Sequence, residues 1–450
     1  MDDLGIVTNM QIEAMVATPS DVHFGIERYY GNEQVAKMAE TYSKERREQQ
    51  SAREKQEETN EEVDNAPIVL LVNKIIEQAV NERASDIHIE ALENSVRVRF
   101  RIDGVMQEMM RYERELLNAI IARIKIISGM NIAEKRAPQD GRMTQRFNRV
   151  EYDIRVSSLP TVFGEKVVMR LASKSALTRD KSELGFPELE LKRFDDLVHK
   201  PHGIILVTGP TGSGKSTTLY TVLSELNSGS VNIVTVEDPV EADVDGINQV
   251  QVNEKAGLTF ASALRSILRQ DPDIIMIGEI RDEETAGIAV KAAITGHLVV
   301  STLHTNSAAS TVTRLEDMGV EPYLIADSTE GIIAQRLVRR LCPKCKKRHN
   351  LTEEDKKRLH LRGDAEPVVY EPNGQGCAFC NGTGYRGRIG VYEIMTISKE
   401  IRKVITAGGG ADEIQKTALS EGMTTLRLGA VKLVLKGVTS ISEVERIAAE

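Results

Sequence analysis

The sequence has no tryptophan, and aromatic residues make up only 4% of its 450 residues. It has no apolar run near the roughly 18 residues that a membrane-spanning helix requires. The amino terminus shows no basic region followed by an apolar stretch, as a signal peptide would. A net charge of -9 argues against a general polyanion binder. We therefore expect a cytoplasmic protein that neither binds nucleic acid nor inserts directly into a membrane.

Cysteine is also scarce, and its four residues form two C-x-x-C pairs 31 residues apart: Cys342, Cys345, Cys377 and Cys380. So few cysteines, in this spacing, suit a reducing compartment and a bound metal. Four thiolates would fill every position of a tetrahedral Zn²⁺ ion, which predicts a structural zinc site without an open position for water. Redox-active disulfides are the alternative.

The length predicts more than one domain. Residues 1–31 are too short to enclose a core, and 32–66 form a charged linker with few apolar residues. An α+β domain bearing many arginines is expected over 67–172, where alternation predicts a strand over 96–102. Strands then alternate with helices over 184–450, which predicts an α/β domain with a mostly parallel sheet. A zinc-binding insert is expected at 341–388, and helices at 400–449.

A phosphate-binding loop follows the apolar strand predicted at 204–207 and opens a helix. Its pattern is G-x-x-x-x-G-K-[ST], in which backbone N–H groups surround the phosphates and the lysine reaches the outer ones. The serine after the lysine can ligate Mg²⁺. The residues expected to bind nucleotide here are Gly209, Pro210, Thr211, Gly212, Ser213, Gly214, Lys215, Ser216 and Thr217.

Carboxylates at the ends of two other strands indicate hydrolysis as well as binding. Glu279 follows the apolar strand 274–277, where it can orient or deprotonate the attacking water. Gly278 replaces the usual aspartate there, so the carboxylate that supports the metal is left open. Glu237 and Asp238 follow a second predicted strand, and we assign Asp273 to the nucleotide site as well.

Two histidines bracket the strand predicted over 298–303. His304 could sense the γ-phosphate by hydrogen bonding, and His297 precedes the same strand. A structural histidine is the alternative at each position.

These motifs in this order resemble the secretion superfamily of hexameric ATPases, from about Pro67 onward. The closest likeness is to the type II secretion and type IV pilus extension branches, because pilus retraction ATPases generally lack the four cysteines. The resemblance implies a RecA-like ATPase domain preceded by a PAS-like domain, with ATP, Mg²⁺ and Zn²⁺ bound. It also implies that residues 1–31 are the tail of an amino-terminal domain that docks to an inner-membrane platform.

The resemblance further suggests roles that spacing alone does not show. Glu237 and Asp238 match an aspartate box, Glu279 the Walker B glutamate, and His297 and His304 a histidine box. The arginines implied to neutralise phosphate charge are Arg155 and Arg170 in the first domain, and Arg265, Arg269 and Arg281 near the Walker B segment.

We therefore expect a homo-hexameric ATPase, peripheral to the inner face of the cell membrane. It would drive assembly of a type IV pilus or a type II secretion pseudopilus through an inner-membrane platform protein. A nucleic-acid translocase is one alternative, which the acidic charge and scarce aromatics disfavour. A non-hydrolysing nucleotide sensor is the other, which Lys215 and Glu279 disfavour.

Overall fold

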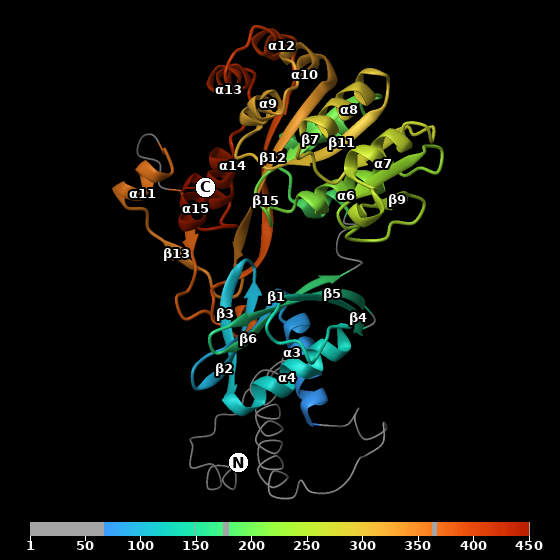
Figure 1. Ribbon diagram of the computed structural model, residues 1–450. Helices are drawn as coiled ribbons and strands as arrows, with labels where there is room; N and C mark the ends of the chain where they lie inside the picture. Colours follow the sequence, from blue (N-terminus) through green and yellow to red (C-terminus); the bar gives the residue numbers. More distant parts are fainter. Residues whose placement is uncertain (1–66, 149, 174–179, 362–366, 450) are drawn as a thin grey trace, which may run out of the picture. The chain divides into compact units, whose positions relative to one another are not determined.

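The computed structural model describes residues 67–148, 150–173, 180–361 and 367–449 (Figure 1). The docking-domain tail expected at 1–31 and the linker expected at 32–66 lie outside the described residues. The chain divides into two compact units. The first takes the described residues up to Met143 and Ile154–Leu171, and the second takes Thr144–Asp153 and those from Ala172 onward. The domain ranges 67–172 and 184–450 stay predictions.

The first unit is built on a six-stranded sheet in the order β3-β2-β1-β6-β5-β4. In it β1 pairs antiparallel with both β2 and β6. The elements are α3 (Pro67–Asn81), β1 (Ala84–Ala91), β2 (Ser95–Ile102), β3 (Val105–Glu113), the 3-10 helix η1 (Arg114–Leu116), α4 (Leu117–Ile127), β4 (Gln139–Phe147), β5 (Val150–Thr161) and β6 (Gly164–Ser173).

The strand predicted over 96–102 is confirmed as β2, and its alternation separates the two faces of the sheet. Its apolar residues Val96, Val98 and Phe100 are fully buried. The intervening arginines lie on the other face, where Arg97 and Arg99 both pair with Glu90 of β1. One face of this sheet therefore contributes to a hydrophobic core, and the other is charged.

The second unit contains a seven-stranded sheet in the order β15-β12-β7-β11-β10-β8-β9. Its first elements are the 3-10 helix η2 (Lys181–Leu184), α5 (Glu188–Val198), β7 (Gly203–Thr208), α6 (Lys215–Leu226), β8 (Ile233–Glu237), β9 (Asn248–Gln251), the 3-10 helix η3 (Glu254–Ala256), α7 (Phe260–Ile267), β10 (Ile274–Ile277), α8 (Glu283–Ile294) and β11 (Leu298–Leu303). The remaining elements are α9 (Ala308–Asp317), α10 (Pro322–Ser328), β12 (Thr329–Leu341), β13 (Lys347–His349), α11 (Glu353–Arg358), β14 (Val369–Glu371), the 3-10 helix η4 (Ala378–Cys380), β15 (Tyr385–Thr396), α12 (Lys399–Thr406), α13 (Ala411–Ser420), α14 (Leu426–Leu435) and α15 (Ile441–Ala449).

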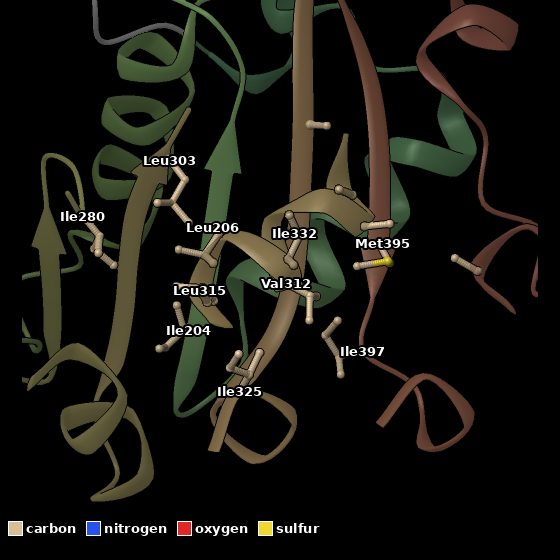
Figure 2. Packing of buried hydrophobic residues seen from close by; sticks show 14 of the residues in the cluster. Ile204, Leu206, Ile280, Leu303, Val312, Leu315, Ile325, Ile332, Met395 and Ile397 are labelled. Atoms are coloured by element: carbon tan, nitrogen blue, oxygen red, sulfur yellow. The ribbon is translucent and has the colours of Figure 1, made fainter. Parts of the chain in front are cut away.

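The sheet is mostly parallel, as predicted: only β15, at one edge, runs antiparallel to its neighbour β12. Successive residues of β7 enter different cores, because side chains alternate along a strand. Ile204 and Leu206 join a cluster with α7 to α10, part of which Figure 2 shows. Ile205 and Val207 join a second cluster with α5 and α6. This two-sided burial explains why the strand reads as a continuous apolar run.

The zinc insert expected at 341–388 interrupts the antiparallel pair β12–β15. Leu341 of β12 pairs with Tyr385 of β15, and β13, α11, β14 and η4 lie between them in the chain. Figure 1 shows this insert beside the carboxyl-terminal helices, and α11 contacts α15. The helices expected at 400–449 are observed as α12 to α15, of which α12 begins one residue earlier, at Lys399. No helix among the described residues is long and apolar enough to cross a membrane.

Candidate nucleotide site and metal centre

The loop 209–214 joins the carboxyl end of β7 to the amino end of α6. Gly209 and Gly214 have φ angles of 150° and 91°. A Cβ atom would lie 2.5 Å from the Gln335 carbonyl oxygen at Gly209, and 2.8 Å from Gln335 Nε2 at Gly214. Glycine is therefore required at both positions, by conformation and by close packing. The loop places a helix amino terminus, which attracts phosphate, at the end of β7.

Lys215 is the first residue of α6, and its ammonium group turns back over the loop. Nζ donates to the carbonyl oxygen of Gly209 at 2.6 Å and to that of Pro210 at 3.2 Å. Burial lowers the pKa of Lys215 to about 8, although Glu279 and Glu241 oppose this shift. The ammonium thus lies at the phosphate loop, and the carboxylates of Glu279 and Glu241 are close enough to favour its charged form.

Glu279 lies just beyond the carboxyl end of β10 and is held by two basic side chains. Its Oε2 atom is 3.5 Å from Nε2 of His304, which follows β11. Arg281 forms an ion pair with Oε1. The Glu279 side chain is 17% exposed, so its carboxylate is largely enclosed but still open to a small molecule.

His304 shares this environment. Burial lowers the pKa of His304, the charge of Lys215 lowers it further, and Glu279 partly opposes both effects. The imidazole is therefore mostly neutral at pH 7 and can accept or donate a single proton. Three catalytic candidates lie together at the carboxyl edge of the parallel sheet, and each follows a different strand: Glu279, His304 and Lys215.

Glu237, at the end of β8, is buried and has several hydrogen-bond donors. Oε2 accepts from the Tyr220 hydroxyl at 2.5 Å. Oε1 accepts from Thr235 Oγ1 at 2.6 Å and from Gln249 Nε2 at 3.1 Å. A carboxylate with three such donors is fixed in place, which favours a supporting role over direct contact with water or phosphate.

Glu241 is the site carboxylate that the sequence reasoning did not assign. Its Oε1 atom accepts a hydrogen bond from Ser216 Oγ at 3.2 Å. Ser216 is the residue expected to ligate Mg²⁺, so a carboxylate lies beside that position even though Gly278 replaces the usual aspartate. The available signal was its place in the acidic segment 237–241, but only the path of the loop shows which carboxylate faces Ser216.

Asp273 and His297 are not brought to this edge. Asp273 precedes β10, and its Oδ2 accepts from the Asn232 backbone N–H at 2.6 Å. His297 precedes β11, and its Nδ1 lies 2.9 Å from the Ala292 carbonyl oxygen. A residue that precedes a parallel strand lies at the opposite edge, and four residues of β10 span about 13 Å.

The remaining sequence-predicted residues lie at the periphery of the site or in the other unit. Asp238 is exposed and helps Glu279, the stronger influence, to raise the pKa of Arg281. Arg265 pairs with Glu284 of α8, and Arg269 donates to the Arg265 carbonyl oxygen at 2.7 Å. Both therefore have partners within their own unit.

Arg155 and Arg170 belong to the first unit. Arg170, on β6, donates from Nε to Asp86 Oδ1 at 3.2 Å, and its side chain is 65% exposed. Arg155 lies on β5 and is partly buried. The structure thus shows them as residues of the first sheet, and their role toward nucleotide stays a prediction.

The four cysteines converge as their spacing predicts. All four sulfur atoms lie within 4.8 Å of one another. Three of the S···S distances are 3.7 Å: Cys342–Cys377, Cys345–Cys380 and Cys377–Cys380. Zn–S bonds of about 2.3 Å place tetrahedral thiolates about 3.8 Å apart, so this cluster fits zinc.

Backbone amides favour a thiolate at Cys380, whereas burial raises the pKa of Cys342 and of Cys345. The N–H groups of Cys377 and Gly384 donate to Sγ of Cys380 at 3.1 and 3.2 Å. Burial raises the pKa of Cys380, but these two amides and the side chains of Cys345 and Cys377 together lower it to about 7. Deprotonated sulfur is the form that binds zinc, so these amides favour the zinc-binding form at Cys380.

Comparison with known proteins decides the family. The profile described as "Type II/IV secretion system protein" matches residues 61–446. The chain belongs to this secretion-system family. It is 48% identical to the type IV pilus assembly ATPase PilB of Myxococcus xanthus, over 99% of this chain and 79% of that protein. It is 49% identical to the type II secretion system protein E of Dickeya dadantii, over 86% of this chain and 77% of that protein.

Solved structures of similar proteins agree with the observed fold. The pilus retraction motor PilT with bound ADP is 26% identical, with a TM-score of 0.56, over 84% of this chain and 96% of that chain. The ATPase DotB of Legionella pneumophila, at 22% identity and a TM-score of 0.62, shares the fold over 84% of this chain and 95% of that chain. As a member of the secretion-system family, the chain is an ATPase with a P-loop, which confirms the predicted enzyme class.

Proposed function

We propose that this ATPase is a homo-hexameric motor that assembles a type IV pilus or a type II secretion pseudopilus. It would act at the cytoplasmic side of the inner membrane through a platform protein embedded there. The observation that carries the chemistry is the grouping of Glu279, His304 and Lys215 at the P-loop edge. The likeness to pilus assembly and type II secretion ATPases supports the assembly role.

In this proposal Lys215 leaves the loop carbonyls and binds the β- and γ-phosphates. The loop N–H groups bind the remaining phosphate oxygens. Glu279 accepts a proton from the attacking water, while Arg281 and His304 keep its two oxygens oriented. Holding the base in one orientation removes the cost of ordering it during the reaction.

Ser216 and Glu241 are the residues that would hold Mg²⁺. A hydroxyl and a carboxylate oxygen, already within hydrogen-bond distance, are ligands of the type that this ion prefers. When bound, Mg²⁺ neutralises charge on the β- and γ-phosphate oxygens. Glu237 accepts a hydrogen bond from the Tyr220 hydroxyl, which in turn accepts one from the backbone N–H of Glu241.

Two further features complete the proposal. Arg155 and Arg170 would add positive charge to the γ-phosphate when the first unit approaches bound nucleotide, in the same or a neighbouring subunit. The four-cysteine cluster would bind one Zn²⁺ per chain in a structural role, because all four positions are filled by sulfur.

Phosphate release from ATP tests the chemistry. Wild type should turn over, and Glu279→Gln should bind ATP but release little phosphate, because an amide cannot accept the proton. Glu283→Gln, an exposed change at the start of α8, is the control and should behave as wild type. Equal turnover in wild type and Glu279→Gln would contradict the proposed base.

Two measurements test the assembly role. Sedimentation with ATP should show a species of six chains. Binding to the isolated cytoplasmic part of a pilus or type II secretion platform protein should accelerate phosphate release. A monomer under all nucleotide conditions, or turnover that DNA stimulates and the platform protein does not, would overturn this role.

A further inference from the structure

Tyr220 lies on α6 one helical turn after Ser216, and it is only 2% exposed. Its aromatic ring therefore fills the interior, while its hydroxyl group must find partners there. Residues four apart lie on the same face of a helix, so Tyr220 and Ser216 face the same loop. That loop, residues 238–244, carries Glu241.

The Tyr220 hydroxyl joins three elements. It donates to Glu237 Oε2 at 2.5 Å. It also accepts from the backbone N–H groups of Glu241 at 3.2 Å and Ala242 at 3.3 Å. A hydroxyl that donates to a carboxylate becomes a better acceptor, so these bonds reinforce one another.

Gln249 of β9 also holds this loop, and its Nε2 lies 3.5 Å from the Tyr220 hydroxyl oxygen. Its Nε2 donates to the Ala242 carbonyl oxygen at 2.9 Å, and its Oε1 accepts from Val244 N–H at 2.8 Å. The loop is therefore fixed at Ala242 and Val244 by Gln249, and at Glu241 by Tyr220. Among these contacts, Tyr220 alone reaches the backbone of the residue whose carboxylate meets Ser216.

We propose that Tyr220 is a positioning residue for the magnesium ion of ATP hydrolysis. It fixes the backbone of Glu241 and so holds the Glu241 carboxylate beside the Ser216 hydroxyl. This inference rests on the proposed role of Ser216 and Glu241 as the residues that hold Mg²⁺. Burial raises the pKa of Tyr220, so its phenol stays protonated and remains a donor to Glu237 throughout the working pH range.

The test is the Mg²⁺ concentration that gives half-maximal phosphate release. Tyr220→Phe removes the hydroxyl and should raise this concentration about tenfold, as loss of an outer-shell partner does at other metal sites. Saturating Mg²⁺ should restore most of the turnover. Binding of a fluorescent ATP analogue in EDTA should stay unchanged, because the P-loop is intact.

Thr235→Val is the matched control. It removes another buried donor to Glu237, at Oε1, without touching the backbone of Glu241. It should lower the melting temperature as Tyr220→Phe does but leave the Mg²⁺ requirement at the wild-type value. Equal Mg²⁺ shifts in both variants would overturn the inference, since the effect would then come from general loosening around Glu237.

A third variant separates this inference from the proposed function. Glu241→Gln should raise the Mg²⁺ requirement at least as much as Tyr220→Phe does. If Glu241→Gln has no effect, the proposed metal role of Glu241 fails. If Glu241→Gln shifts the requirement and Tyr220→Phe does not, the inference about Tyr220 alone fails.

Should Tyr220→Phe fail to fold, 3-fluorotyrosine at position 220 decides the question. It keeps the hydroxyl in place but weakens it as an acceptor. A smaller rise in the Mg²⁺ requirement supports the inference, and a wild-type value overturns it.

Discussion

The carboxylate of Glu279 lies 3.5 Å from the imidazole Nε2 of His304. The two residues follow adjacent parallel strands, β10 and β11, so the sheet itself sets their separation. Arg281 holds the other carboxylate oxygen. Rotation of Glu279 is therefore restricted on both sides, and removal of either neighbour should misplace the proposed base.

His304→Ala should lower kcat by about 10- to 100-fold with little effect on ATP binding. The reason is that His304 orients the proposed base Glu279 and does not hold the phosphates. His297→Ala is the matched control, since His297 belongs to the same proposed histidine box but lies at the opposite edge of the sheet. Phosphate release under saturating ATP is the measurement. Equal losses in the two variants would contradict the placement.

ATP affinity should decrease as pH rises through about 8. Burial lowers the pKa of Lys215 to about 8. Above this pH, ATP binds either to a neutral amine or with uptake of a proton by Lys215. We expect the dissociation constant to increase by up to about tenfold per pH unit above this value. A fluorescent ATP analogue titrated between pH 7 and 9.5 measures the effect. Lys215→Arg stays charged and should remove this dependence; the same slope in both proteins would contradict it.

Without nucleotide, the same lysine should affect stability in the opposite direction. Its folded pKa is below the unfolded value of 10.5, so between about pH 8 and 10.5 the unfolded chain holds more protons. The free-energy cost of burying the charged ammonium is therefore fully present below pH 8, and it is lost as the pH rises from about 8 to 10.5. Urea unfolding should show that the free energies of unfolding of wild type and Lys215→Met become more similar as the pH rises. A difference that stays constant with pH would contradict this prediction.

Arg155→Ala and Arg170→Ala should lower turnover far more than they weaken ATP binding, if the first unit supplies charge in the reacting state. Folding stability should change little for Arg170, whose side chain is largely exposed. Arg111→Ala provides a control in the same unit, since Arg111 is 54% exposed and pairs with Glu108. Wild-type turnover in both test variants would remove these arginines from the mechanism.

Removal of zinc should loosen the insert without abolishing ATP binding. Protein purified under reducing conditions should contain one Zn²⁺ per chain, and Cys377→Ser should contain much less. Hydrogen exchange should then increase in β13 and β14 and stay unchanged in β7. Elemental analysis that finds no metal in the wild-type protein would refute the site.

Glu443 should be a major stabilising residue of the carboxyl-terminal region. It is fully buried, and it accepts from the backbone N–H of Arg339 at 2.8 Å and from the Arg339 guanidinium at 2.7 Å. Glu443→Ala should cost about 3–5 kcal/mol, because it leaves a guanidinium without its carboxylate. Glu445→Ala, whose carboxylate is half exposed, should cost less than about 1 kcal/mol.

This contribution should also depend on pH. Burial raises the pKa of Glu443, but hydrogen bonds from Arg446 and Arg339 lower it by more than burial raises it. The pKa therefore lies below the usual value for a glutamate. The stabilisation is therefore present above the unfolded pKa and is lost as pH falls through the lower folded value. Unfolding experiments between pH 3 and 7 should show that the free energies of unfolding of Glu443→Ala and wild type become similar at the lowest pH.

Local patterns were sufficient for much of the fold. The strand at 298–303 could be bounded from sequence because an apolar run, a preceding glycine and a following polar segment mark its ends. The cysteine pairs predicted a cluster because zinc chemistry allows few arrangements. Direction along a strand was the information that the site assignment lacked: Asp273 and His297 precede their strands, whereas the P-loop, Glu279 and His304 follow theirs.

The partnership of Ser216 and Glu241 could not be read in the same way. It depends on the path of the loop 238–244, which Tyr220 and Gln249 determine through backbone contacts. Neither contact has a spacing rule, because α6, the loop and β9 come from separate parts of the chain. Sequence periodicity identifies elements, but it does not tell which loop side chain meets which helix.

The antiparallel pair formed by β12 and β15 has a consequence for how this protein can vary. Leu341 and Tyr385 are paired neighbours, so everything between them leaves and re-enters the sheet at a single point. A short hairpin turn could close that point, since antiparallel strands need no longer connection. Evolution could therefore gain, lose or replace the cysteine-bearing segment as a unit, while β12 kept its pairing with β7 and the P-loop kept its place.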